Sequence, residues 1–253
     1  MISRRDVNAF SLGLLTVVLL TGCNRWPGKP EEKDRWIPST EIMDFNKLYS
    51  QRCSGCHGKD GRLGAARPLN DPLYQALASV ETLRRVIGKG VPGTSMPAFL
   101  DEAGGSLTAK QIDVLVEGMK SSWGHSQTYA GIAIPPYSLE DAIAQGSGPG
   151  DVLRGAAVAK TYCAHCHGVD GNGGTKGGSI VDPNYLALVS DQSLRVTVIA
   201  GRSDLDIPDW RANLPGQPMT PQEISDVVAW MASHRLRPGQ IILPVIGAVA
   251  AGQ

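Results

Sequence analysis

One nine-residue stretch occurs twice in the chain and restricts its possible folds more than any other feature. Residues 53–61 read Cys-Ser-Gly-Cys-His-Gly-Lys-Asp-Gly, and residues 163–171 read Cys-Ala-His-Cys-His-Gly-Val-Asp-Gly, 110 positions later. The match continues at an offset of 112 in three further pairs: Thr108 and Thr220, Ile112 and Ile224, Met119 and Met231. Since a chain of 253 residues has room for two domains, the repeat predicts two similar ones.

Both copies contain Cys-x-x-Cys-His, the attachment signature of c-type haem. Cysteines three residues apart on a helical turn lie on one face, so their thiols can bond to the two vinyl groups of one porphyrin. The adjacent histidine can then bind the iron as its proximal ligand. We therefore predict two covalently bound haem c groups, attached at Cys53, Cys56, Cys163 and Cys166, with His57 and His167 as iron ligands.

Disulfide pairs and zinc sites also use Cys-x-x-Cys. A disulfide does not explain why a histidine follows each pair, and a structural zinc site normally gathers four ligands in one knuckle. The cysteine count favours haem. Two haems would use four of the 5 cysteines, and the fifth, Cys23, has a separate expected role as a lipid anchor, so no free thiol remains.

Residues 44–236 resemble the class I cytochrome c family, in a tandem di-haem arrangement. The resemblance implies an all-α fold of two cytochrome c domains, residues 44–125 and 149–236, each a small helical bundle around one haem. It also implies a helix before each motif and a last helix packed across it. The candidates for the first helices contain Phe45, Leu48, Tyr49 and Arg52, and Val152, Ala156, Ala159 and Tyr162.

The last helices are predicted at residues 108–121 and 220–234. Each opens with a threonine, a favoured N-cap residue, followed by apolar residues at the spacing of one helix face. Pro221 would occupy the first helical position, where its missing N–H costs nothing.

The family usually supplies the second axial ligand from a methionine on the loop before the last helix, often followed by proline. Met96 stands in such a setting, Gly93-Thr94-Ser95-Met96-Pro97. The resemblance therefore implies Met96 as the sixth ligand of the first haem, and methionine ligation raises a haem's reduction potential.

The second half departs from this pattern. At an offset of 111, Ile207 falls on the position of Met96, and isoleucine cannot bind iron. Met219 is the nearest alternative, although the repeat pairs it with Leu107. Two alternatives remain: an open or water-ligated iron, or a ligand from elsewhere, such as His234, His125 or a partner chain. An open site would admit small molecules such as nitric oxide, carbon monoxide or peroxide.

The N-terminus reads as an export signal over residues 1–22, with Arg4 and Arg5 before an apolar run from Phe10 to Leu20. Leu20-Thr21-Gly22-Cys23 resembles a bacterial lipobox, which implies Cys23 as the acylated anchor. Residues 23–43 contain three prolines and are expected to form a tether.

Two further segments have the composition of connecting or terminal pieces. Residues 126–148 contain Pro135 and Pro136, which marks a linker, and we expect it to run along the domains. Residues 237–253 form an apolar tail too short to span a bilayer.

Charge removes one class of partner. With 24 basic and 24 acidic residues, the chain lacks the positive surplus that binding to nucleic acid requires. The resemblance implies a non-enzymatic electron carrier, lipid-anchored on the periplasmic side of a bacterial membrane. Its expected partners are redox proteins, in particular a respiratory or photosynthetic oxidoreductase complex. The alternative is a haem enzyme or sensor with an open sixth position at the second haem.

Overall fold

The computed structural model describes residues 31–125, 128–214 and 216–236. The predicted signal peptide, the anchor Cys23, the start of the tether and the apolar tail lie outside these residues. Residues up to Ile42 form one unit, in which two short 3-10 helices are described: η2 (Glu32–Asp34) and η3 (Ser39–Glu41). Residues from Met43 onward form the other unit, which contains both copies of the repeat.

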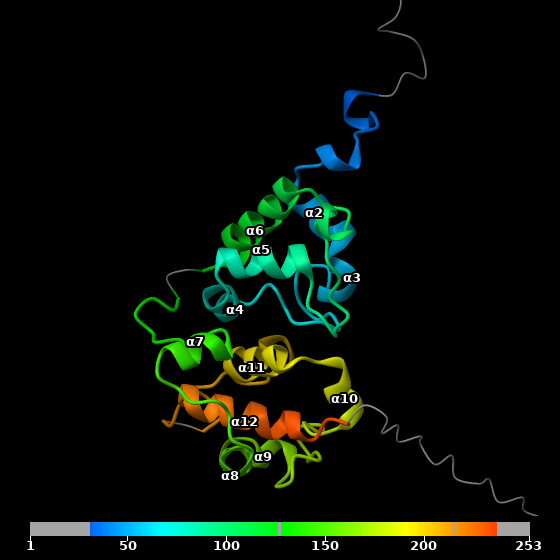
Figure 1. Ribbon diagram of the computed structural model, residues 1–253. Helices are drawn as coiled ribbons and strands as arrows, with labels where there is room; N and C mark the ends of the chain where they lie inside the picture. Colours follow the sequence, from blue (N-terminus) through cyan, green and yellow to red (C-terminus); the bar gives the residue numbers. More distant parts are fainter. Residues whose placement is uncertain (1–30, 126–127, 215, 237–253) are drawn as a thin grey trace, which may run out of the picture. The chain divides into compact units, whose positions relative to one another are not determined.

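The two halves of the larger unit have the same succession of helices (Figure 1). The first half consists of α2 (Phe45–Arg52), α3 (Ser54–His57), α4 (Pro72–Leu77), α5 (Val80–Lys89) and α6 (Ala109–Trp123). The second half repeats them as α8 (Val152–Tyr162), α9 (Ala164–His167), α10 (Pro183–Leu188), α11 (Asp191–Ala200) and α12 (Pro221–Ser233). Short 3-10 turns, η4 (Asp101–Ala103) and η5 (Ser203–Leu205), precede the last helices. Within the described residues β-structure is limited to isolated bridges, so the all-α prediction is confirmed.

Equivalent N-caps explain why corresponding helices begin at corresponding places. The caps are aspartate before the first helix, aspartate before the third, serine before the fourth and threonine before the last, in both halves. Thr108 and Thr220 each form a full capping box, with Gln111 and Glu223 respectively. The predicted threonine caps and the place of Pro221 at the start of α12 are confirmed.

The first and last helices of each half cross where one of them carries a glycine. In the first half, a Cβ on Gly118 of α6 would lie 2.2 Å from the ring of Phe45 on α2. In the second half, a Cβ on Gly155 of α8 would lie 2.1 Å from the Asp226 carbonyl oxygen and 2.6 Å from the Cβ of Trp230, both on α12. The glycine at the crossing therefore changes helix between the halves. Either arrangement lets the two helices approach closely enough to bury their apolar faces.

The segment predicted as a linker contains a helix that its proline and glycine content did not indicate. Helix α7 (Leu139–Ala144) begins at the N-cap Ser138, with acidic residues in its first turn. Ala142 is fully buried, and α7 contacts α12. Just before it, the carbonyl groups of Pro136 and Tyr137 accept hydrogen bonds from Arg195 and Gln192 of α11. The segment is thus packed along the second half, while its exact bounds stay a prediction.

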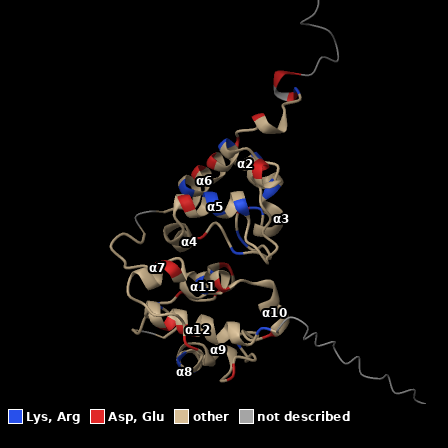
Figure 2. Cartoon of the chain, viewed as in Figure 1, with Lys and Arg blue, Asp and Glu red and all other residues tan. Residues whose placement is uncertain are grey.

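Basic and acidic residues occur together on α5 and α6, as the colours of Figure 2 show. One exposed pair, Arg84 of α5 and Asp113 of α6, lies 2.6 Å apart. Among the described helices, none combines the length and the hydropathy that crossing a bilayer requires.

Candidate haem sites

Each Cys-x-x-Cys-His motif forms a single helical turn that follows directly from the first helix. The N–H of Cys53 donates to the Tyr49 carbonyl of α2, and the N–H of His57 donates back to Cys53 at 3.0 Å. Cys163 and His167 repeat both bonds in the second half, at 2.8 and 2.9 Å. The backbone therefore brings together the two cysteines and the histidine of each motif, as the sequence predicts.

Both motif histidines have one ring nitrogen fixed by the backbone. Nδ1 of His57 lies 2.7 Å from the carbonyl oxygen of Arg67, and Nδ1 of His167 lies 2.7 Å from that of Gly178. Because a carbonyl can only accept, Nδ1 must carry the proton in both rings, which leaves Nε2 with a free lone pair. A backbone hydrogen bond of this kind fixes the tautomer and the orientation of a metal-binding histidine.

Burial affects the protonation of the motif histidine His57 and of one cysteine in each motif. It lowers the pKa of His57, which favours the neutral ring that a metal requires. It raises the pKa of the Cys53 thiol to about 12 and that of Cys163 to about 11. These thiols are neutral at pH 7, in contrast to the low-pKa thiolates of catalytic or redox-active cysteines.

The loop before the last helix has the same backbone bond in both halves, which fixes the correspondence of their residues. The N–H of Val91 donates to the carbonyl of Met96, and the N–H of Arg202 donates to that of Ile207. Both loops begin at a glycine with positive φ, Gly90 and Gly201. Ile207 therefore occupies the backbone position of Met96.

A second pair of bonds defines the place of Met219. Its N–H donates to the Trp210 carbonyl, just as the N–H of Leu107 donates to that of Phe99. Met219 is 3% exposed and is the counterpart of the buried Leu107, as the repeat indicated.

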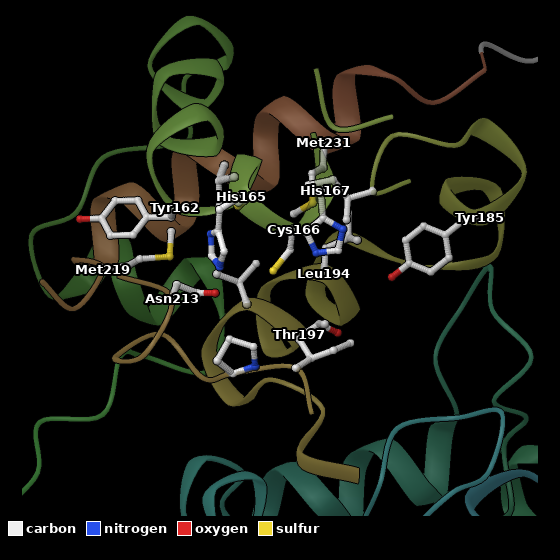
Figure 3. Close-up of a pocket in the computed structure, with 16 residues that line it drawn as sticks. Tyr162, His165, Cys166, His167, Tyr185, Leu194, Thr197, Asn213, Met219 and Met231 are labelled. Carbon is white, nitrogen blue, oxygen red and sulfur yellow. The ribbon is translucent and has the colours of Figure 1, made fainter. Parts of the chain in front are cut away.

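The second half contains a pocket beside its motif (Figure 3). Cys163, Cys166 and His167 line it, and α11 contributes Leu194, Thr197 and Val198. Its other walls are formed by Tyr162, His165, Ile180, Tyr185, Ile207, Pro208, Asn213, Met219, Val227 and Met231. Both Ile207 and Met219 are thus placed at the pocket. In the view of Figure 3, Met219 lies on the side of Tyr162 and Asn213, and His167 on the side of Tyr185.

The other two candidate ligands do not line this pocket. His234 is exposed, and its Nδ1 lies 2.8 Å from the Trp230 carbonyl one turn earlier on α12. His125 is also exposed and follows α6 in the first half. Neither is therefore placed to bind an iron at His167 in this conformation.

The residues present fit a covalent haem. A largely apolar pocket contains two free thiols and a histidine with an available Nε2, which are the donors that haem c uses. Gly177 adds a steric fit, because a Cβ there would lie 2.8 Å from the His167 ring. In the part of the chain that the structure describes, no group of three or more His, Cys, Asp or Glu side chains is arranged to hold a metal ion, as a zinc knuckle would be.

Comparison with known proteins agrees with the internal repeat. Residues 152–235 match the family model described as cytochrome c. Residues 40–117 match the model described as cytochrome c oxidase, cbb3-type, subunit III. No curated protein is detectably similar to the chain.

Among solved structures, the chain is similar to one from the Kuenenia stuttgartiensis reducing HAO-like protein complex Kustc0457/Kustc0458. The identity is 17% and the TM-score 0.43, over 80% of this chain and all of the other.

The fold, the motifs and the two family matches define a helical protein with a haem-attachment site in each half. The chain contains two cytochrome c domains, and such domains carry two covalently bound c-type haems and indicate electron transfer.

Some residues of the sites escaped the sequence analysis. The carbonyl groups of Arg67 and Gly178 could not be identified, since any residue type supplies a carbonyl. Thr197, Tyr185 and Asn213 carry no local pattern, and they reach the pocket only through the fold.

Proposed function

We propose that the chain is a di-haem electron carrier in which Cys53 and Cys56 attach the first haem and Cys163 and Cys166 the second. His57 and His167 bind the two irons through Nε2, and Met96 closes the first site. The observation that carries the proposal is the pair of equivalent Nδ1 hydrogen bonds, which present Nε2 from both rings. When bound, the two haems would supply one-electron transfer between the ferric and ferrous states of their irons. The chain's own residues hold the porphyrins, fix the imidazoles and exclude water.

The direct test is mass spectrometry of the denatured protein produced with the haem-attachment machinery. The polypeptide mass is expected to exceed the apoprotein mass by two haem groups. Cys53→Ala with Cys56→Ala should remove one group, and Cys163→Ala with Cys166→Ala the other. A denatured chain without covalent haem would contradict the proposal.

The lipid anchor and the periplasmic location belong to the same proposal. Their support is the charged start, the apolar run and the lipobox that ends at Cys23. Radiolabelled palmitate should label the wild-type chain in bacteria and leave Cys23→Ser unlabelled. Equal labelling of the two would exclude acylation at Cys23.

We further propose that the carrier works as a subunit of an oxidoreductase complex. The support is the description of the model that residues 40–117 match, which names a subunit of cytochrome c oxidase. After extraction from membranes in mild detergent, the tagged chain should migrate with other subunits at a mass well above its own. Migration with no mass beyond that of the processed chain and its two haems would make it an independent carrier.

A second candidate function is favoured by Ile207. Because an isoleucine occupies the backbone position of Met96, the second iron lacks a ligand from that position and can bind a small molecule. Under this candidate the second haem is a reaction or sensing centre. Met219, at the same pocket, would instead close the site.

Carbon monoxide separates these two functions. It should shift the absorption of half of the ferrous haem if the second site is open, and of none if Met219 closes it. Two exchanged variants serve as controls. Ile207→Met should abolish the shift, and Met96→Ile should open the first site to carbon monoxide as well.

A further inference from the structure

One side chain of the first half reaches into the second half beside its pocket. Nη2 of Arg67 donates to Oγ1 of Thr197 at 2.6 Å, and Nη1 donates to the carbonyl of Gly201 at 3.4 Å. Thr197 belongs to α11, and Gly201 is the C-cap of that helix. A cation is favourable at this end of a helix, where carbonyl groups lack partners and the helix dipole is negative. Arg67 thus caps α11 from the other half of the chain.

The backbone of the same arginine holds an iron-ligand candidate. The Arg67 carbonyl is the acceptor for Nδ1 of His57. One residue is therefore bonded through its main chain to the first motif histidine and through its side chain to the second half.

Thr197 is a fixed partner for this side chain. Its hydroxyl donates to the Ser193 carbonyl at 2.8 Å, so Oγ1 is left to accept a hydrogen bond from Arg67. Thr197 also lines the pocket around His167. The contact therefore ends at the wall of the second haem site.

Other bonds keep the loop that contains Arg67 against the second half. The N–H of Leu63 donates to Oδ2 of Asp204 at 3.0 Å, and Nη2 of Arg202 donates to the Gly64 carbonyl at 3.3 Å. Helix α4, which follows the loop, contacts α11. Movement of the second half relative to the first would accordingly move the Arg67 backbone.

We propose that Arg67 is a positioning residue through which the second half, acting at Thr197, sets the hydrogen bond to His57 and with it the reduction potential of the first haem. The inference rests on the proposed role of His57 as an iron ligand. A firm Nδ1–H···O bond makes the imidazole a stronger donor, which favours ferric iron. Loosening the anchor should weaken that bond and raise the potential of the first haem.

The test is Thr197→Val in the full-length, haem-loaded chain, which removes the acceptor without changing any charge. Potentials are measured by optical redox titration, and the first haem is identified as the one whose midpoint moves in Met96→Ile. At a fixed solution potential, the reduced-to-oxidised ratio of the first haem should rise about three- to tenfold, a factor of ten being ~59 mV. Arg67→Lys keeps the charge but loses the forked donor, and it should shift the ratio in the same direction.

The double variant Arg67→Lys with Thr197→Val tests whether the two residues act through one contact, because independent effects would give additive midpoint shifts. If both residues act through one contact, Thr197→Val should add little once Arg67 is lysine. Thr197→Ser keeps the hydroxyl and should restore the wild-type midpoint. Thr161→Val is the matched control, because that hydroxyl donates to the Ala157 carbonyl within α8.

An unchanged first midpoint in Thr197→Val, or fully additive shifts in the double variant, would overturn the inference. Failure of the proposed function would give a different result. Either the wild-type chain would lack a haem, or the His57→Ala variant would have the same spectrum as the wild type.

Discussion

A glycine and an aromatic residue exchange places between the two halves at the helix crossing. Phe45 packs its ring over Gly118 in the first half, whereas in the second Gly155 lies against the Asp226 carbonyl and the Cβ of Trp230. The repeat shows that Phe45 corresponds to Gly155 at an offset of 110 and Gly118 to Trp230 at 112. At each of these positions the two halves carry different residues. In both halves, however, the helix crossing combines one glycine with one larger residue. Only the fold reveals the exchange, since the partners lie more than 70 residues apart.

Gly118→Ala should therefore destabilise the protein through a clash with the Phe45 ring. Overpacking of this kind costs roughly 1–3 kcal/mol, because the helix backbones must separate. The free energy of unfolding, measured by guanidinium titration of the haem-loaded chain, checks the value.

The Phe45→Gly background supplies the control for that substitution. It removes the ring and also the Phe45 Cβ, which lies 2.9 Å from a Cβ at position 118, so alanine has room on α6 and a better helix propensity than glycine. The same Gly118→Ala change should then be neutral or stabilising by up to about 1 kcal/mol. An equal cost in both backgrounds would mean that the ring is not the cause.

The helices were more predictable than the loops because their signals are local. Threonine caps and apolar spacing placed α6 and α12 within two residues of their observed ends. Helix α7 was missed, because its six residues depend on packing against α12 more than on a pattern of their own. The loops place the carbonyl groups of Arg67 and Gly178 beside the motif histidines, and the Arg67 side chain beside Thr197 of α11. These contacts have no sequence signature.

The capping boxes allow a comparison of equivalent elements. Thr108→Ala and Thr220→Ala should each cost about 1 kcal/mol, since each removes the acceptor for a backbone N–H in the first helical turn. Thr→Ser at either position keeps the acceptor and should cost much less. Thermal unfolding followed by circular dichroism measures all four variants, and a cost for serine equal to that for alanine would exclude capping as the cause.

At the scale of the whole molecule, Asp204 connects the halves through a buried carboxylate. Its side chain is 0% exposed, it bonds twice to Arg202, at 2.9 Å each, and it accepts the N–H of Leu63 from the other half. The hydrogen bonds from Arg202 lower the pKa of Asp204 from 3.8 to about 2, against the opposing effect of burial. Neither Leu63 nor Asp204 stands in a recognisable motif, so this connection too was beyond sequence analysis.

The lowered pKa gives the stability of the folded chain a pH dependence. A carboxylate whose pKa is lower in the folded state contributes stability that is present above pH 4 and is lost as the pH falls toward 2. With a shift of nearly two units, the loss at pH 2 is about 2 kcal/mol.

Asp204→Asn cannot titrate, so from pH 6 to pH 2 the wild-type free energy of unfolding should fall by about that much more than the variant's. Asp113→Asn, which breaks the exposed pair with Arg84, is the matched control, because solvent screens such pairs and they contribute little to stability. Parallel pH profiles for the wild type and Asp204→Asn would show that ionisation of this carboxylate does not stabilise the fold.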